Sequence, residues 1–222
     1  MAKILKLAVL ISGTGRSLHN ILNRIKSETL SAEVSLVVAS TPTAKGLQYA
    51  EMESIPIRII ERPSYPSIEH FSDDVFAACR EKSVDYVIMA GYLKHLRIPD
   101  DFNLRVLNIH PSLTPAFCGR GMYGNNVHAK VLEYGTKISG CTVHFVNQDY
   151  DNGPVILQRA VEVFANDTPD MLNDRVFAQE CNAYPEAIQM LAEERITVNG
   201  RIVHIAKPKS DQNDDEDGFS ST

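Results

Sequence analysis

The sequence lacks a long apolar run, and no stretch approaches the roughly 20 consecutive apolar residues that a membrane-spanning helix needs. Met1-Ala2-Lys3 leads directly into a predicted strand, without the pattern of a signal peptide. Cysteine is also scarce, and the four cysteines form no C-x-x-C pair of the kind found in zinc sites. We therefore expect a cytoplasmic protein that does not enter a membrane, has no disulfide framework and needs no metal.

An excess of basic residues is missing as well. The formal net charge is −6, and five negative charges fall between Asp211 and Asp217, so the remainder of the chain carries only −1. Nucleic-acid-binding proteins usually present a basic surface, and we therefore expect no nucleic-acid partner. With 222 residues, 44% of them hydrophobic, the chain can build one sizeable core. We expect a single domain over residues 1–206 and an acidic, disordered tail over residues 207–222.

Apolar strands alternate with helical patterns in the first half of the chain. Strands are predicted at residues 7–11, 33–39, 57–60, 85–89 and 104–107, with helices at about 18–25, 44–53 and 68–81 between them. This alternation predicts an α/β fold, with a Rossmann-like, mostly parallel central sheet flanked by helices. The C-terminal half adds an antiparallel extension: a short helix at 128–134, strands around Asp151, a long helix from 169 to about 194 and a hairpin over 196–205.

A polar pair follows the last apolar run of this sheet. Asn108 and His110 stand two residues apart just after the run Leu104–Leu107. In an extended segment both side chains would lie on one face, so an amide and an imidazole could reach the same atom of a small molecule. Ligands of open α/β sheets bind beyond the carboxyl ends of the strands, where this pair would lie. Taken alone, the pattern also fits a capped strand end with a surface histidine.

A glycine turn follows the first strand. Ser12-Gly13-Thr14-Gly15-Arg16-Ser17 leads into a helix, whose unpaired N–H groups would favour a phosphate. A dinucleotide fits poorly, because Leu18 stands where G-x-G-x-x-G requires glycine and Val38-Ala39-Ser40-Thr41 lacks an acidic residue for the ribose. The turn therefore predicts a single phosphate monoester. A tight turn with a capping serine is the alternative.

A third polar segment lies farther along the chain, where an acidic turn after the strand 139–146 places Asp151 on a loop tip. The motifs N-I-H-P-S-L-x-P and C-T-V-H-F-V-x(4)-D-x-G-P-V-I-L-Q closely resemble those of the phosphoribosylglycinamide formyltransferases, folate-dependent enzymes of purine synthesis, and the resemblance covers residues 4–195. It implies transfer of the formyl group of 10-formyltetrahydrofolate to the amine of 5′-phosphoribosylglycinamide. Asn108 and protonated His110 would stabilise the tetrahedral oxyanion, while Asp151 would favour the imidazolium and hold a relay water.

The resemblance also implies how the two substrates are bound. Arg16 and Ser17 replace the serine and asparagine of the family's G-x-G-S-N phosphate turn, and Ile68 replaces a family arginine that contacts the folate tail, a role open to Lys94 or Arg97. The implied contacts of phosphoribosylglycinamide are Gly15, Arg16, Ser17, Pro111 and Glu180. Those of the folate are Leu93, Lys94, His95, Leu96, Val146 and Asn147.

Several features leave alternatives open. The loop 117–126 has three glycines and could close over a substrate or simply connect two elements. His128 matches a family histidine but also fits a solvated helix start, and His144 fits a satisfied core histidine better than a site residue. The rival functions are a formyltransferase for another amine, a formyltetrahydrofolate hydrolase and a non-catalytic nucleotide- or folate-binding module. A monomer and a homodimer are both compatible with the sequence.

Overall fold

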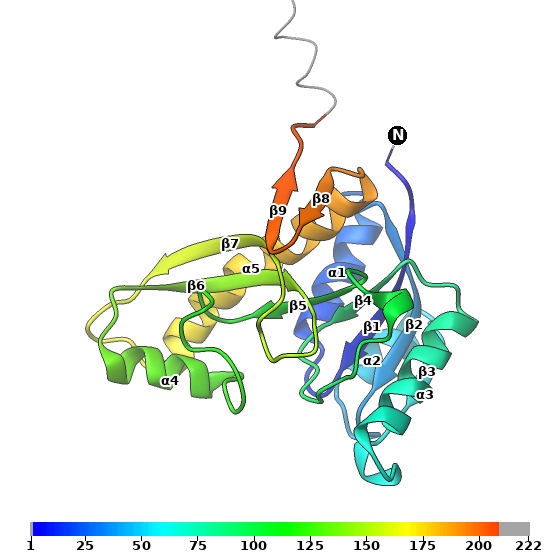
Figure 1. Cartoon of the computed structure of the whole chain (residues 1–222). Coiled ribbons are helices and arrows are strands. Elements are labelled where there is room, and N and C mark those ends of the chain that lie inside the picture. Colours follow the sequence, from blue (N-terminus) through cyan, green and yellow to red (C-terminus); the bar gives the residue numbers. More distant parts are fainter. Residues whose placement is uncertain (1, 209–222) are drawn as a thin grey trace, which may run out of the picture.

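A computed structural model describes residues 2–208 (Figure 1). Seven strands form the central sheet in the order β3-β2-β1-β4-β5-β6-β7, and a separate hairpin pairs β8 with β9. The strands are β1 (Leu5–Ile11), β2 (Ala32–Ala39), β3 (Ile57–Ile59), β4 (Tyr86–Met89), β5 (Val106–His110), β6 (Ile138–Phe145), β7 (Val155–Glu162), β8 (Ile196–Asn199) and β9 (Ile202–Ile205). The helices are α1 (Arg16–Lys26), α2 (Leu47–Met52), α3 (Ile68–Glu81), α4 (Asn125–Tyr134) and α5 (Pro169–Ala192).

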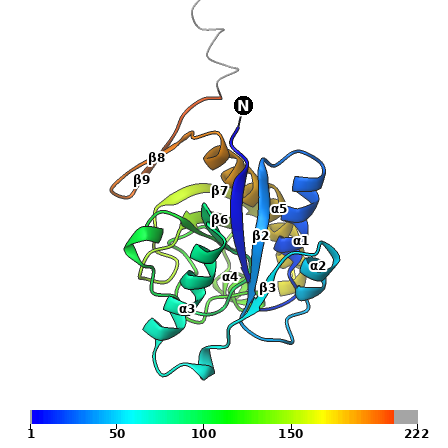
Figure 2. The same ribbon diagram turned by 90° about the vertical axis from the view of Figure 1, so that its right-hand side faces the viewer.

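The predicted α/β architecture is confirmed. Strands β3, β2, β1, β4 and β5 run parallel to one another, whereas β6 pairs antiparallel with both β5 and β7. Helices cover both faces, with α3 on one side of β1 and β2 and α1, α2 and α5 on the other (Figure 2). The residues of β1 alternate between these two layers: Leu7 and Val9 pack with α1 and α5, and Ala8 and Leu10 pack with α3. Burial on both faces explains why β1 reads as a continuous apolar run.

Some predicted boundaries shift for physical reasons. The strand predicted at 104–107 begins at Val106 and continues to His110, because Leu104 has the left-handed φ of +55° and turns the chain. The helix predicted from residue 44 begins at Leu47, since Gly46 donates a hydrogen bond to the Gly13 carbonyl at 3.0 Å and its backbone packs on the glycine turn. The hairpin over 196–205 is confirmed.

The remaining expectations concern the C-terminal tail and membrane-spanning helices. Most of the predicted acidic tail, residues 209–222, lies outside the described residues. Within residues 2–208, no helix combines the length and apolar character needed to cross a membrane.

The register of the sheet aligns the polar segments. Leu10 of β1 pairs with Met89 of β4, and Met89 pairs with Asn108 of β5, so the strand ends lie side by side. Because β5 is longer at this edge, His110 extends beyond the end of β4. The glycine turn, the segment after β4 and the Asn108–His110 pair therefore meet at one edge of the sheet.

Candidate active site

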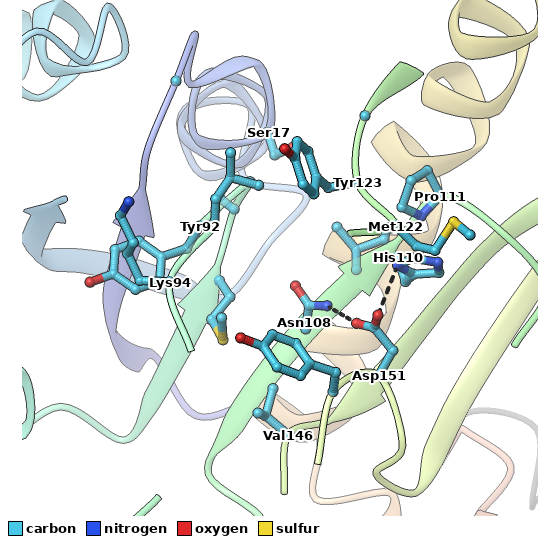
Figure 3. Close-up of a pocket in the computed structure, with 18 of the residues that line it drawn as sticks. Ser17, Tyr92, Lys94, Asn108, His110, Pro111, Met122, Tyr123, Val146 and Asp151 are labelled. Carbon is cyan, nitrogen blue, oxygen red and sulfur yellow. Dashed lines mark hydrogen bonds and ion pairs between the residues drawn. The ribbon is translucent and has the colours of Figure 1, made fainter. Parts of the chain in front are cut away.

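A cavity of about 580 Å³ lies at this edge of the sheet. Figure 3 shows Asn108 and His110 both directed toward Asp151 on its wall. The cavity is lined by all the residues that the sequence predicted for the site: Gly15, Arg16, Ser17, Leu93, Lys94, His95, Leu96, Asn108, His110, Pro111, Val146, Asn147, Asp151 and Glu180. The structure thus brings the three predicted groups of residues together around one space.

The Asp151 carboxylate faces hydrogen-bond donors from three segments. Its Oδ2 accepts a hydrogen bond from the Gly119 backbone N–H at 2.9 Å and lies 3.5 Å from His110 Nδ1. Its Oδ1 accepts a hydrogen bond from Asn108 Nδ2 at 3.3 Å. Asp151 holds this position with a left-handed φ of +48° in the turn between β6 and β7, a conformation that aspartate tolerates better than most residues.

Both nitrogens of His110 face acceptors. Nε2 lies 2.8 Å from the Phe117 carbonyl oxygen, which can only accept, so Nε2 carries a proton. Nδ1 faces the Asp151 carboxylate at 3.5 Å, and an unprotonated Nδ1 would set its lone pair against that negative charge. With only 3% of the side chain exposed, little water can intervene. This geometry fits an imidazolium paired with a carboxylate.

His144 is the neutral member of the cluster. Its Nδ1–H donates to the Phe145 carbonyl at 2.8 Å, which leaves Nε2 free to accept from Asn108 Nδ2 at 3.3 Å. Burial lowers the pKa of His144, and this agrees with the neutral form. Because His144 Nε2 and Asp151 Oδ1 both accept, the atom of Asn108 facing them is nitrogen, and Figure 3 shows its oxygen turned away from Asp151.

The two contacts of Asn108 bear on its predicted role as a donor. Both measure 3.3 Å, slightly beyond the usual range for N–H···O hydrogen bonds. A developing oxyanion carries more negative charge than the neutral His144 nitrogen and can compete for the same hydrogen. The Asn108 amide is therefore oriented by two long contacts and can still donate a hydrogen bond to an oxyanion.

The glycine turn offers an uncapped helix start. Gly15 has a φ of +71°, and a Cβ atom there would lie 2.5 Å from Gly46 Cα, so only glycine fits. The N-cap of α1 is Gly15 and no side chain caps the helix, so the alternative of a capping serine is wrong. Arg16 and Ser17 begin the helix on the cavity wall. Free N–H groups and the positive end of the helix dipole suit an anion at this point.

The segment after β4 is tied to its surroundings through its backbone and one ring. Ser12 Oγ accepts hydrogen bonds from Leu93 N–H at 2.9 Å and from Ser40 Oγ at 2.7 Å. The His95 ring packs against Tyr150 in a tilted arrangement, with centroids 4.5 Å apart and planes at 35°, and its Nε2 lies 3.0 Å from the Gln148 carbonyl oxygen. These contacts join the segment to the turn that carries Asp151.

The two cations suggested for the folate tail differ in position. Lys94 lies on the cavity wall. Arg97 forms an ion pair with Glu69 of α3, with its Nε 3.6 Å from Oε1. Lys94 is therefore the better placed of the two for a ligand in the cavity.

Comparisons with known proteins show the family of this chain. Residues 5–188 match the model of the formyl transferase family. The chain belongs to this family. The phosphoribosylglycinamide formyltransferase of Haemophilus influenzae is 32% identical over 210 residues, which are 92% of this chain and 97% of that protein. The chloroplastic phosphoribosylglycinamide formyltransferase of Arabidopsis thaliana is 39% identical over 194 residues, and there the chain spans 86% of its own length but 66% of the plant protein.

A solved structure is similar over nearly the whole fold. The crystal structure of glycinamide ribonucleotide transformylase 1 from Symbiobacterium toebii has a TM-score of 0.87 to this member of the formyl transferase family. The two are 38% identical, and the match covers 92% of this chain and 95% of the other.

The structure bears on the alternatives that the sequence left open for three residues of this formyl transferase. His144 is buried and hydrogen-bonded, as expected of a core histidine, but it also lies on the cavity wall beside Asp151, with Nε2 3.8 Å from Oδ1. The solvated alternative for His128 is wrong, because its side chain is fully buried and burial lowers its pKa to about 4. Glu180, which would pass for a surface charge on α5, lines the cavity, and burial raises its pKa to about 7.

The pairing of β5 with β6 is the signal that could have placed His144 beside Asn108. In an antiparallel ladder, directly opposite residues place their side chains on the same face. Asn108 pairs with His144, and His110 pairs with Thr142. The register, however, depends on how β6 docks on β5, which is not encoded in either strand alone.

Proposed function

We propose that this chain transfers the formyl group of 10-formyltetrahydrofolate to the amine of 5′-phosphoribosylglycinamide, a step of purine biosynthesis. The observation that carries this proposal is the single cavity that joins the uncapped start of α1, the polar cluster around Asp151 and the segment 93–96. A phosphate, a reacting amine and a folate require three such regions in contact. The names of the relatives in Haemophilus influenzae and Arabidopsis thaliana support the same activity.

In the proposed reaction, the amine nitrogen attacks the formyl carbon and forms a tetrahedral intermediate with a negatively charged oxygen. The proposed donors to that oxygen are the amide of Asn108 and the Nδ1–H of the His110 imidazolium, because their distances to Asp151, 3.3 Å and 3.5 Å, are long enough for the oxyanion to compete. The intermediate collapses when the bond from the carbon to the folate nitrogen breaks. Asp151 holds a water that takes the proton from the attacking amine and delivers one to the departing nitrogen, so the enzyme ends the cycle unchanged.

Binding of the substrates away from the reacting atoms fixes their geometry. In this proposal the substrate phosphate lies at Gly15, Arg16 and Ser17, and the rest of the molecule contacts Pro111 and Glu180. The folate lies along Leu93, Lys94, His95 and Leu96 and reaches Val146 and Asn147. All of these residues face the same cavity, which supports the assignment.

The decisive experiment is incubation of the full chain with both substrates, following release of tetrahydrofolate and formylation of the amine. The proposal predicts equal amounts of the two products and no release when phosphoribosylglycinamide is omitted. Tetrahydrofolate released without the amine would indicate a hydrolase. Turnover with a different amine would indicate another formyltransferase, and ligand binding without turnover would indicate a binding module.

A further inference from the structure

The guanidinium of Arg16 is held at the cavity wall by helix α5. Its Cζ lies 3.6 Å from the centre of the Phe177 ring, and its Nη2 lies 3.6 Å from Asp174 Oδ1. Asp174 and Phe177 are three residues apart, so they present neighbouring positions on one face of the helix. Two elements far apart in the sequence thus fix one cation at the start of α1.

The two contacts leave most of the binding capacity of Arg16 free. A ring beneath a guanidinium contacts its flat face, while the N–H donors point outward in the plane. The Asp174 side chain is 76% exposed, and an exposed ion pair at this distance is weak. A ligand with a stronger negative charge can therefore replace Asp174 without moving the guanidinium from the ring.

The surroundings favour a phosphate as that ligand. The helix start beside Arg16 has no side-chain cap, so its backbone N–H groups face the same space. Glu180 is the carboxyl group that α5 contributes to the cavity wall, and it is a poor competitor because burial raises its pKa to about 7. The stacked guanidinium supplies a planar pair of donors, which matches the oxygens of a phosphate.

We propose that Phe177 and Asp174 set the phosphate preference of this site by acting through Arg16. Phe177 is a positioning residue that keeps the guanidinium in place. Asp174 is a weak internal competitor, which a phosphate monoester dianion displaces and which a ligand with a single negative charge, or none, does not displace as effectively. This inference rests on the proposed function only for the identity of the phosphate ester.

The experiment compares two ligands that differ only in the phosphate. Affinities of phosphoribosylglycinamide and of its dephosphorylated nucleoside are measured by calorimetry for the wild type, Phe177→Leu, Phe177→Tyr and Asp174→Asn. The readout is the ratio of the two affinities, because a merely structural defect lowers both alike. Asp73→Asn on α3 serves as the control, since it removes the same charge from an exposed position on the opposite face of the sheet.

Phe177→Leu keeps an apolar side chain but removes the ring, so we expect the affinity ratio to fall about tenfold, roughly the value of one charge-assisted hydrogen bond. Phe177→Tyr should restore the ratio. Asp174→Asn should raise the affinity for the phosphate ester severalfold, whereas Asp73→Asn should leave it unchanged. Equal ratios in the wild type, Phe177→Leu and Asp174→Asn would overturn the inference.

A second arm separates this inference from the proposed function. Inorganic phosphate is titrated into the same five proteins, the Asp73→Asn control included, with no purine precursor and no folate present. If the wild type binds inorganic phosphate and Phe177→Leu weakens that binding, the role of Phe177 stands even where phosphoribosylglycinamide proves not to be the substrate. If inorganic phosphate binds the wild type and Phe177→Leu equally, the inference fails whatever the substrate is.

Discussion

Replacement of Asp151 by asparagine should strongly reduce turnover while leaving the fold intact. Asparagine has nearly the same shape, but it carries no charge and turns one acceptor oxygen into an NH₂ donor. Both oxygens of Asp151 face donors: Gly119 N–H and His110 Nδ1 on one side, and Asn108 Nδ2 on the other. In either orientation of the asparagine amide, its NH₂ group faces an N–H group that the Asp151 carboxylate faced. The imidazolium of His110 also loses its counter-charge.

The size of the effect can be estimated from these contacts. A hydrogen bond to a charged group contributes about 1.5–3 kcal/mol. If that contribution is lost when His110 must be charged in the transition state, kcat falls about 10- to 150-fold, because about 1.4 kcal/mol corresponds to a factor of ten. Loss of the proton relay adds to this, since general acid–base catalysis typically contributes at least about 100-fold. We therefore expect a decrease in kcat of at least about 100-fold.

The assay is the steady-state rate of tetrahydrofolate release at saturating substrates, with thermal melting to verify folding. Asp149→Asn is the matched control, because Asp149 is an exposed acid of the same turn and the same cavity. Its carboxylate accepts a hydrogen bond from Asn152 at 3.3 Å and, within residues 2–208, none from Asn108 or His110. The Asp149→Asn protein should retain normal kcat. A folded Asp151→Asn protein with near-normal kcat, or an equal loss in Asp149→Asn, would refute the proposed role of the carboxylate.

Three further predictions concern buried groups and the glycine turn. Burial lowers the pKa of His128 from 6.5 to about 4, so the unfolded chain takes up the proton first and the protein loses stability as pH falls from 6.5 to 4. His128→Phe should reduce this loss of stability, measured by urea unfolding at pH 7 and pH 5. An equal loss in the wild type and the variant would contradict this prediction. Burial raises the pKa of Glu180 from 4.5 to about 7, so the neutral form stabilises the fold and this stabilisation is lost as pH rises through 7. Glu180→Gln should therefore melt at a higher temperature than the wild type at pH 8 but not at pH 4. A difference in melting temperature that does not depend on pH would contradict this prediction. Gly46 has a φ of −65° that alanine can adopt, but its Cβ would lie 2.7 Å from Gly15 Cα; Gly46→Ala should raise KM for phosphoribosylglycinamide severalfold without changing KM for the folate, and equal changes in both would indicate a general defect instead.

The sequence predicts the parts of the site that follow a strand end directly. Asn108 and His110 belong to one strand, and their relative position is set by the two-residue period of that strand. Gly15 marks the start of a helix, which has the same free N–H groups in any fold. The resemblance to a known family then indicated which loop residues share the cavity with them.

The contacts that the sequence could not predict depend on packing between distant elements. Arg16 lies over Phe177 because α1 and α5 cover the same face of the sheet. His144 reaches Asn108 because of the register between β5 and β6. Neither relation leaves a local pattern: Phe177 fits an ordinary apolar residue of α5, and His144 sits in a strand that is almost entirely buried. Tertiary packing decides both.

The change of direction within the sheet explains how Asp151 reaches a site formed by parallel strands. If β6 ran parallel to β5, its carboxyl end would lie beyond His110. Because β6 is antiparallel to β5, its last residue, Phe145, lies opposite Leu107, which precedes Asn108 and His110 in β5. The turn that follows must then fold back over the site, and Gly153 permits this, since a Cβ atom there would lie only 1.7 Å from the Phe145 carbonyl oxygen. The antiparallel extension therefore supplies the carboxylate of the cluster from the side, while the parallel strands supply the anion site and the polar pair.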